Sequence, residues 1–156
     1  FHFKMDEGYV SCEVFDPSGI KGPKESNVFH INNVHVRGAE IFVSGRRLGN
    51  LLRLKNGVVE NLDRVPPGTH NVMPFNKGVL YNDSEADQLT YSTNYDYRRS
   101  AVVKYSEEEL QQRELGDDLV ARQAFGRGLA LLKNGIVVGG SSPSTLSVYD
   151  LKKQVI

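Results

Sequence analysis

The chain has 156 residues, with 19 basic and 19 acidic side chains and a formal net charge of zero. A domain of this length buries about two thirds of its unfolded surface, so it needs no disulfide framework, and the single cysteine, Cys12, cannot form an internal one. Because the sequence has neither a basic stripe nor a run of about 18 apolar residues, it argues against nucleic-acid binding, membrane binding and a transmembrane segment.

The first residues, from Phe1 to Lys4, have neither the basic start nor the apolar stretch of a signal peptide. A single cysteine fits a reducing compartment or an exported fold that needs no disulfide. With no visible leader, we expect a cytoplasmic location. The chain begins without Met, so we also expect that other residues preceded Phe1.

Three stretches of the chain align with one another without a gap. The second lies 38 residues after the first, and the third lies 57 residues after the second. Four apolar columns agree under these offsets: Val34, Val72 and Leu129; Ile41, Val79 and Ile136; Val43, Tyr81 and Val138; and Leu51, Leu89 and Leu146. Self-similarity at a period of about 40 residues, in units of short strands and Gly-containing turns, is typical of β-propeller blades.

Residues 28–67 form the clearest unit and predict four strands. Apolar and polar residues alternate in 34–37 and 41–44, which is the period of two of a β-strand. Residues 51–54 predict a third strand, and the Asn56-Gly57 pair predicts a tight hairpin into a fourth. Two prolines at 66–67 then end the unit, because proline cannot donate to a sheet ladder.

The other units, about 1–27, 69–122 and 125–156, depart from this pattern. The first is a weaker copy, and the last stops after a third strand at 146–151. The unit 69–122 carries an insertion, for which we expect a strand at 101–105 and one short helix from Glu107 to about Leu115, opened by the capping box Ser106-x-x-Glu109.

Within this insertion, the Tyr- and Arg-rich segment 91–99 either forms a contact surface or folds as a loop over the blade edge. Taken together, the units predict a single all-β domain, 1–156, that is β-propeller-like. It contains about four consecutive blade units, the first and last incomplete, with one short inserted helix.

The runs at the unit boundaries resemble a known family. Residues 124–130 (Ala-Phe-Gly-Arg-Gly-Leu-Ala), followed by 137–142, resemble the F-x-R-G-L-A … V-G-x-S blade of an uncharacterised group of bacterial six-bladed β-propeller proteins. Residues 30–33 and 66–71 are similar to its H-x-N-G and P-H-S-P segments, although Asn33 stands where the group has Gly and Asn71 where it has Ser. The resemblance implies a propeller of which this chain is a part, and it implies no reaction.

An open propeller exposes edge strands, which pair readily with other chains. We therefore expect the ring to close through a second copy of the chain, as a homo-oligomer, or through further sequence in a longer chain.

The repeat register places three polar residues, Asn32, His70 and Arg127, at the start of the innermost strand of consecutive units, with Asn71 next to His70. In a propeller these positions line the central channel, so we expect His70 and Arg127 to lie close together at its mouth. His70 would act there as a base or a ligand, and Arg127 would hold a carboxylate or phosphate. Alternatively, these side chains satisfy loop carbonyls and waters.

Asn82 and Asp83 follow the second strand of their unit. Together with Asn32 and Asn71 they would complete a calcium site, because calcium takes about six to eight oxygen ligands. The alternative is an Asx-type turn, in which the side chain bonds to its own backbone.

The sequence thus leaves two functions open and assigns no catalytic residue. The first is a binding or interaction module whose polar channel takes a small anionic ligand or a loop of a protein partner. The second is a calcium-dependent hydrolase, because the wider superfamily that the chain resembles includes metal-dependent lactonases beside NHL-type interaction modules. The chain contains no Gly-x-Ser-x-Gly motif, so serine hydrolysis is unsupported.

Overall fold

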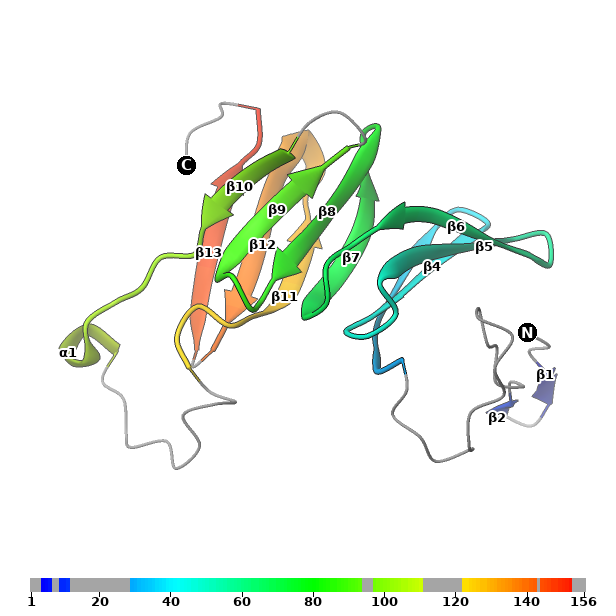
Figure 1. Ribbon diagram of the computed structural model, residues 1–156, viewed down its shortest axis with the longest axis horizontal. Helices are drawn as coiled ribbons and strands as arrows, with labels where there is room; N and C mark the ends of the chain where they lie inside the picture. The colour runs from blue at the N-terminus through cyan, green and yellow to red at the C-terminus, as the bar shows by residue number, and fades with distance from the viewer. Residues whose placement is uncertain are drawn as a thin grey trace.

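The structure is a computed structural model, and it describes residues 4–6, 9–11, 29–93, 97–110, 122–142 and 144–152. The described chain forms four antiparallel sheets in sequence order, each built from neighbouring strands joined by short connections (Figure 1). Its helical residues are confined to α1 (Glu107–Leu110) and a 3-10 turn (Lys133–Gly135). The prediction of an all-β fold with one short inserted helix is therefore confirmed.

The first sheet is a hairpin of β1 (Lys4–Asp6) and β2 (Tyr9–Ser11). The leading sheet contains, in order, β3 (Ile31–Arg37), β4 (Glu40–Gly45), β5 (Asn50–Lys55) and β6 (Val58–Arg64). The central sheet contains β7 (Thr69–Phe75), β8 (Gly78–Asp83), β9 (Gln88–Ser92) and β10 (Tyr97–Ala101). The trailing sheet contains β11 (Gly126–Leu131), β12 (Ile136–Ser141) and β13 (Thr145–Asp150).

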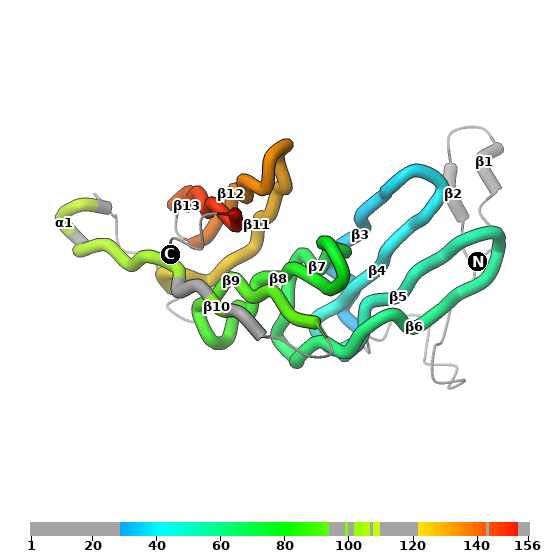
Figure 2. Tube along the Cα trace, turned by 90° about the horizontal axis from the view of Figure 1, so that it is seen from above, coloured from blue at the N-terminus to red at the C-terminus, as the bar shows by residue number. Residues whose placement is uncertain are grey.

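The leading, central and trailing sheets stack face to face through their first strands. Strand β7 contacts β3 and β4 of the leading sheet, and β11 contacts β7 and β8 of the central sheet. Figure 2 shows the three sheets following one another along the molecule in chain order. Consecutive small antiparallel sheets that meet at their first strands have the arrangement of propeller blades.

The central sheet is buried on both faces. One core lies between the leading and central sheets and contains Phe42, Leu51, Val65, Val72, Val79 and Tyr81. The other lies between the central and trailing sheets and contains Met73, Leu80, Leu89 and Val137, with Leu129 and Tyr149 packed against it. Alternate residues of β7 and β8 therefore point into different cores, as the period of a strand requires.

Strand pairing confirms the gap-free alignment of the leading and central sheets but corrects it in the trailing sheet. In the central sheet Pro74 pairs with Val79, whereas in the trailing sheet Leu131, at the equivalent place, pairs with Val137. The turn between β11 and β12 is longer than the turn between β7 and β8, because it contains the 3-10 residues Lys133–Gly135. Val137, and not Ile136, thus occupies the buried place of Val79.

Three local predictions can be compared with the structure. The Asn56-Gly57 hairpin is confirmed, since both residues have positive φ, of 51° and 76°. The capping box is confirmed as well: Glu109 N–H donates to Ser106 Oγ at 3.2 Å, and Ser106 N–H donates to the Glu109 carboxylate at 2.8 Å. The helix that it opens is described from Glu107 to Leu110, and the rest of the predicted helix, to Leu115, lies outside the described residues.

The predicted strand at 101–105 is wrong, because the strand ends at residue 101 and begins at Tyr97. The Tyr- and Arg-rich segment is therefore no loop over the blade edge where it is described: Tyr91 lies in β9 and residues 97–99 lie in β10, which pairs with β9. Residues 94–96 lie outside the described part of the chain.

No helix in the described residues is long and apolar enough to span a membrane.

Candidate functional site

The first strands of the three stacked sheets share a β-bulge near their starts. Each strand has its own bulge. The bulge of β3 contains Asn32, that of β11 contains Arg127, and that of β7 directly follows His70. A bulge re-aims side chains and is frequent beside functional sites. The repeat therefore places the three predicted polar residues at equivalent irregularities of three contacting sheets.

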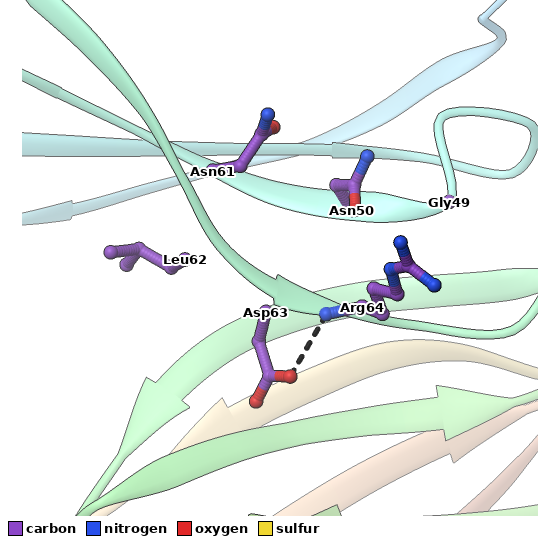
Figure 3. Close-up of a pocket in the computed structure, with 6 residues that line it drawn as sticks. All are labelled: Gly49, Asn50, Asn61, Leu62, Asp63 and Arg64. Atoms are coloured by element: carbon purple, nitrogen blue, oxygen red, sulfur yellow. Dashed lines mark hydrogen bonds between the residues drawn. The ribbon is translucent and has the colours of Figure 1, made fainter. Parts of the chain in front are cut away.

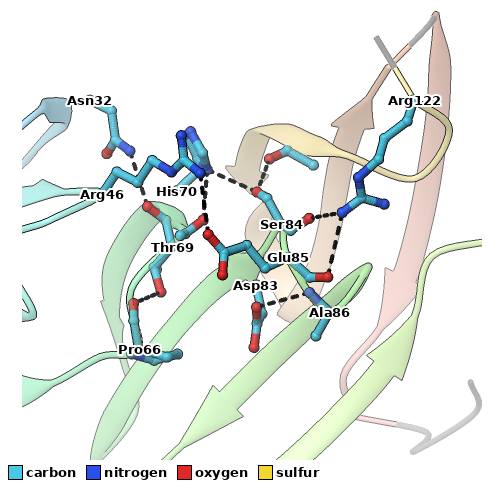
Figure 4. A network of polar contacts seen from close by, with 12 residues as sticks. Asn32, Arg46, Pro66, Thr69, His70, Asp83, Ser84, Glu85, Ala86 and Arg122 are labelled. Atoms are coloured by element: carbon cyan, nitrogen blue, oxygen red, sulfur yellow. Dashed lines mark hydrogen bonds and ion pairs between the residues drawn. The ribbon is translucent and has the colours of Figure 1, made fainter. Parts of the chain in front are cut away.

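His70 is 8% exposed and is held by two oxygens (Figure 4). Its Nδ1 lies 3.0 Å from the Gly68 carbonyl and 2.9 Å from Ser84 Oγ, while the Ser84 hydroxyl donates to the Gly126 carbonyl at 2.6 Å. Because a carbonyl can only accept, Nδ1 carries the proton. The Nε2 atom of the neutral ring is then the unprotonated nitrogen, which can accept a hydrogen bond.

Burial lowers the pKa of His70 below its usual value. The Gly68 carbonyl, which favours the charged ring, opposes this change, and the nearby charges of Arg127, Arg46 and His30 lower the pKa further. The imidazole is therefore neutral at pH 7. The positive charge at this site comes from the arginines.

Phe125 joins His70 and Arg127. Its ring centroid lies 5.5 Å from that of His70 in an edge-on arrangement and 5.0 Å from the guanidinium carbon of Arg127. A second guanidinium, from Arg122, lies 5.2 Å from the same centroid. The predicted proximity of His70 and Arg127 is thus found, through an aromatic ring that the sequence analysis did not assign to the site although it stands in the F-x-R motif.

Arg127 differs from the other arginines around it. Arg122 pairs with Asp87 and donates to the Ser84 carbonyl, and Arg46 pairs with Glu85 at 3.2 Å. Arg127 is exposed, and its guanidinium has neither a hydrogen bond nor an ion pair within the described part of the chain. Its donors are therefore available to a ligand.

A hollow of about 390 Å³ opens beside Arg127 on the outer face of the trailing sheet. It is lined by Arg127, Gly128, Gly140, Ser141, Ser142, Ser144, Thr145 and Leu146. The hydroxyls of Ser141 and Thr145 lie 2.6 Å apart. The site thus combines an arginine, several hydroxyls and an apolar side chain.

The leading and central sheets have asparagines at the places that Gly128 and Gly140 occupy in the trailing sheet. These asparagine side chains bind each sheet to the next one. Asn33 Nδ2 donates to the Val72 carbonyl at 2.9 Å, and Asn82 Nδ2 donates to the Gly128 carbonyl and to Asn71 Oδ1, both at 3.1 Å. Asn82 lies so close to β11 that a Cβ on Gly126 would come within 2.8 Å of its Cγ. In this structure Asn82 therefore holds the central and trailing sheets together, and Asn71 accepts a hydrogen bond from it within the central sheet.

Asn32 serves in the same way but keeps one atom unused. Its Nδ2 donates to the Thr69 carbonyl at 3.0 Å, next to His70 in the chain. Its Oδ1 is buried without a hydrogen-bond partner.

Asp83 is the last residue of β8, and its side chain bonds to the turn that follows. Its Oδ1 accepts the Ala86 N–H at 3.2 Å, which corresponds to the Asx-type alternative (Figure 4). The Asn82 amide nitrogen is engaged between sheets, as described above. No group of three or more His, Cys, Asp or Glu side chains in the described residues could hold a metal ion.

A second hollow, of about 730 Å³, lies on the leading sheet (Figure 3). It is lined by Gly49, Asn50, Asn61, Leu62, Asp63 and Arg64. Asp63 Oδ1 accepts the Arg64 N–H at 2.8 Å, and the Arg64 side chain is exposed. None of the predicted site residues lies here.

No protein-family model and no curated protein matches the chain. Similar solved structures include a streptogramin B lyase, with 8% identity and a TM-score of 0.44, matched over 81% of this chain and 42% of that one. A catalytically inactive virginiamycin B lyase from Staphylococcus aureus with quinupristin has 10% identity and a TM-score of 0.42. The match covers 81% of this chain and 43% of that one. The selenomethionine form of that enzyme has 9% identity and a TM-score of 0.40, and also covers 81% and 43%. The chain thus spans less than half the length of these proteins.

Proposed function

We propose that the protein is a binding module that takes a small anionic ligand at Arg127, beside His70. The observation that carries the proposal is the guanidinium of Arg127, which is exposed, stacked on Phe125 and without a protein partner for its donors in the described chain. A guanidinium presents five N–H donors in a planar fork that matches a carboxylate or a phosphate. Stacking on the ring fixes the orientation of this fork before a ligand arrives.

The charges around His70 support an anionic ligand. Arg127, Arg46 and His30 all lie close enough to His70 to lower its pKa, although Glu85 neutralises part of the Arg46 charge. A cluster of one sign of charge attracts a ligand of the opposite sign. The unprotonated Nε2 of His70 would accept a hydrogen bond from a hydroxyl or amino group of the same ligand.

The proposal is tested by calorimetric titration with inorganic phosphate and with acetate. The Arg127→Ala substitution should weaken binding by about 10- to 150-fold, or about 1.5–3 kcal/mol, the range for a hydrogen bond to a charged group. Arg64→Ala is the matched control, because it removes an equally exposed arginine from the leading sheet. It should leave the affinity unchanged.

Equal losses in the two variants would show that anions bind to exposed arginines in general, and the assigned site would then be wrong. A parallel titration with calcium addresses the calcium-dependent hydrolase that the sequence leaves open. Calcium binding that Asp83→Asn abolishes would favour that alternative over the binding module.

A further inference from the structure

The hollow beside Arg127 exists because two glycines replace side chains that the other sheets have. Gly128 and Gly140 pair across β11 and β12, where the leading sheet pairs Asn33 with Ser44. In the central sheet the amide of Asn82 projects from the equivalent place and bonds to the next sheet. The trailing sheet has no side chain there.

The backbone does not require glycine at either position. Neither residue has a positive φ. A Cβ on Gly140 would lie 3.6 Å from Gly128 Cα and 3.8 Å from Leu146 Cδ2, and a Cβ on Gly128 would lie 3.4 Å from Gly140 Cα. These are ordinary van der Waals distances, so what the glycines provide is empty space above the sheet.

The lining of this space has a polar part and an apolar part. Arg127 and the hydroxyls of Ser141 and Thr145 provide hydrogen bonds. Leu146 provides an apolar wall and is 74% exposed, so a ligand that covers it removes apolar surface from water. A bare inorganic anion would use only the polar part of this lining.

We infer that the ligand class is a small organic anion with an aliphatic body, such as a short-chain carboxylate or phosphate ester. Its charged head binds the Arg127 guanidinium, and its body lies over the glycine pair against Leu146. This inference rests on the proposed function, since it names the kind of anion that the same site takes.

The test is a calorimetric titration with acetate, butyrate and hexanoate. Wild-type affinity should rise about two- to fourfold for each added methylene. The upper figure is the rise expected for a methylene that becomes fully buried. Gly140→Asn fills the hollow, and Leu146→Ser removes its apolar wall. Both variants should bind acetate as the wild type does and should lose the dependence on chain length.

Ala130→Asn is the matched control, because Ala130 is exposed on the same face of β11 but does not line the hollow. This variant should keep the full dependence on chain length. Circular dichroism checks that all variants are folded, and Leu146→Ser tests the hollow independently if Gly140→Asn fails this check.

The outcomes separate the two proposals. Acetate, butyrate and hexanoate binding with equal affinity would overturn this inference and leave the anion site in place. A chain-length dependence that persists in both Gly140→Asn and Leu146→Ser would also overturn it, because the tail would then lie elsewhere. Absence of binding for all three acids would overturn the inference, and absence of phosphate binding as well would overturn the proposed function.

Discussion

The central and trailing sheets share the same repeat, yet the faces that carry Leu89 and Leu146 have different surroundings. Leu89 and Leu146 stand in one column of the repeat, and they are 2% and 74% exposed. Next to them, the Asn82 side chain bonds to the following sheet, whereas Gly140 leaves a hollow. The comparison shows that the repeat determines where a strand lies, while the neighbouring sheet determines whether its face forms core or surface.

The largest expected difference comes from truncating the two leucines. Leu89→Ala should lower the free energy of unfolding by about 2–5 kcal/mol, because it leaves a cavity in the core between sheets. Leu146→Ala should change it by less than about 0.5 kcal/mol, as expected for an exposed side chain. Urea denaturation of both variants measures the contrast. Similar losses for the two would mean that the outer face of the trailing sheet is covered in solution.

A smaller effect is expected from the polar contact between sheets. Asn82→Ala should cost about 1–3 kcal/mol, because it leaves the Gly128 carbonyl and Asn71 Oδ1 without their donor. Ala130→Asn, which adds an amide to the exposed face of the trailing sheet, should be neutral within about 0.5 kcal/mol. Thermal unfolding followed by circular dichroism compares them. An unchanged midpoint for Asn82→Ala would contradict the role of this side chain in holding the sheets together.

The pH dependence of stability probes the centre of the site. Burial lowers the pKa of His70, so the folded state binds fewer protons than the unfolded state. The corresponding stability is fully present above the usual histidine pKa of about 6.5 and falls as the pH drops through that value towards the lower pKa of the folded state. Burial also lowers the pKa of His35. The informative quantity is therefore the difference between wild type and His70→Asn.

Unfolding free energies measured from pH 8 to pH 5 should fall less steeply for His70→Asn than for the wild type. The asparagine amide can still donate to the Gly68 carbonyl, so the variant retains the neutral contact and loses only the titration. Parallel curves for the two proteins would show that His70 is not the titrating group.

Local sequence patterns predicted those features that depend on neighbours in the chain. Alternation located β3 and β4, Asn56-Gly57 located a hairpin, and Ser106 with Glu109 located the start of α1. Each of these features depends on residues that lie only a few positions apart in the chain. The predicted proximity of His70 and Arg127 also followed, because their positions depend only on the repeat.

Features that depend on contacts between sheets could not be predicted in this way. The longer turn before β12 shifts Val137 into the core, and an alignment without gaps cannot register one added residue. In the sequence, Asn82 is a candidate metal ligand. Only its hydrogen bond to the Gly128 carbonyl shows that it joins two sheets. Phe125 is an ordinary apolar residue until its ring is seen between His70 and Arg127.

The most direct test of the central claim is a crystal structure of the protein soaked in butyrate. We expect the carboxylate within about 2.7–2.9 Å of the Arg127 guanidinium nitrogens, the distance of a charge-assisted hydrogen bond, with the carbon chain over Gly128 and Gly140. A butyrate bound elsewhere on the molecule, or an acidic side chain of the protein already paired with Arg127, would contradict the assignment of this site.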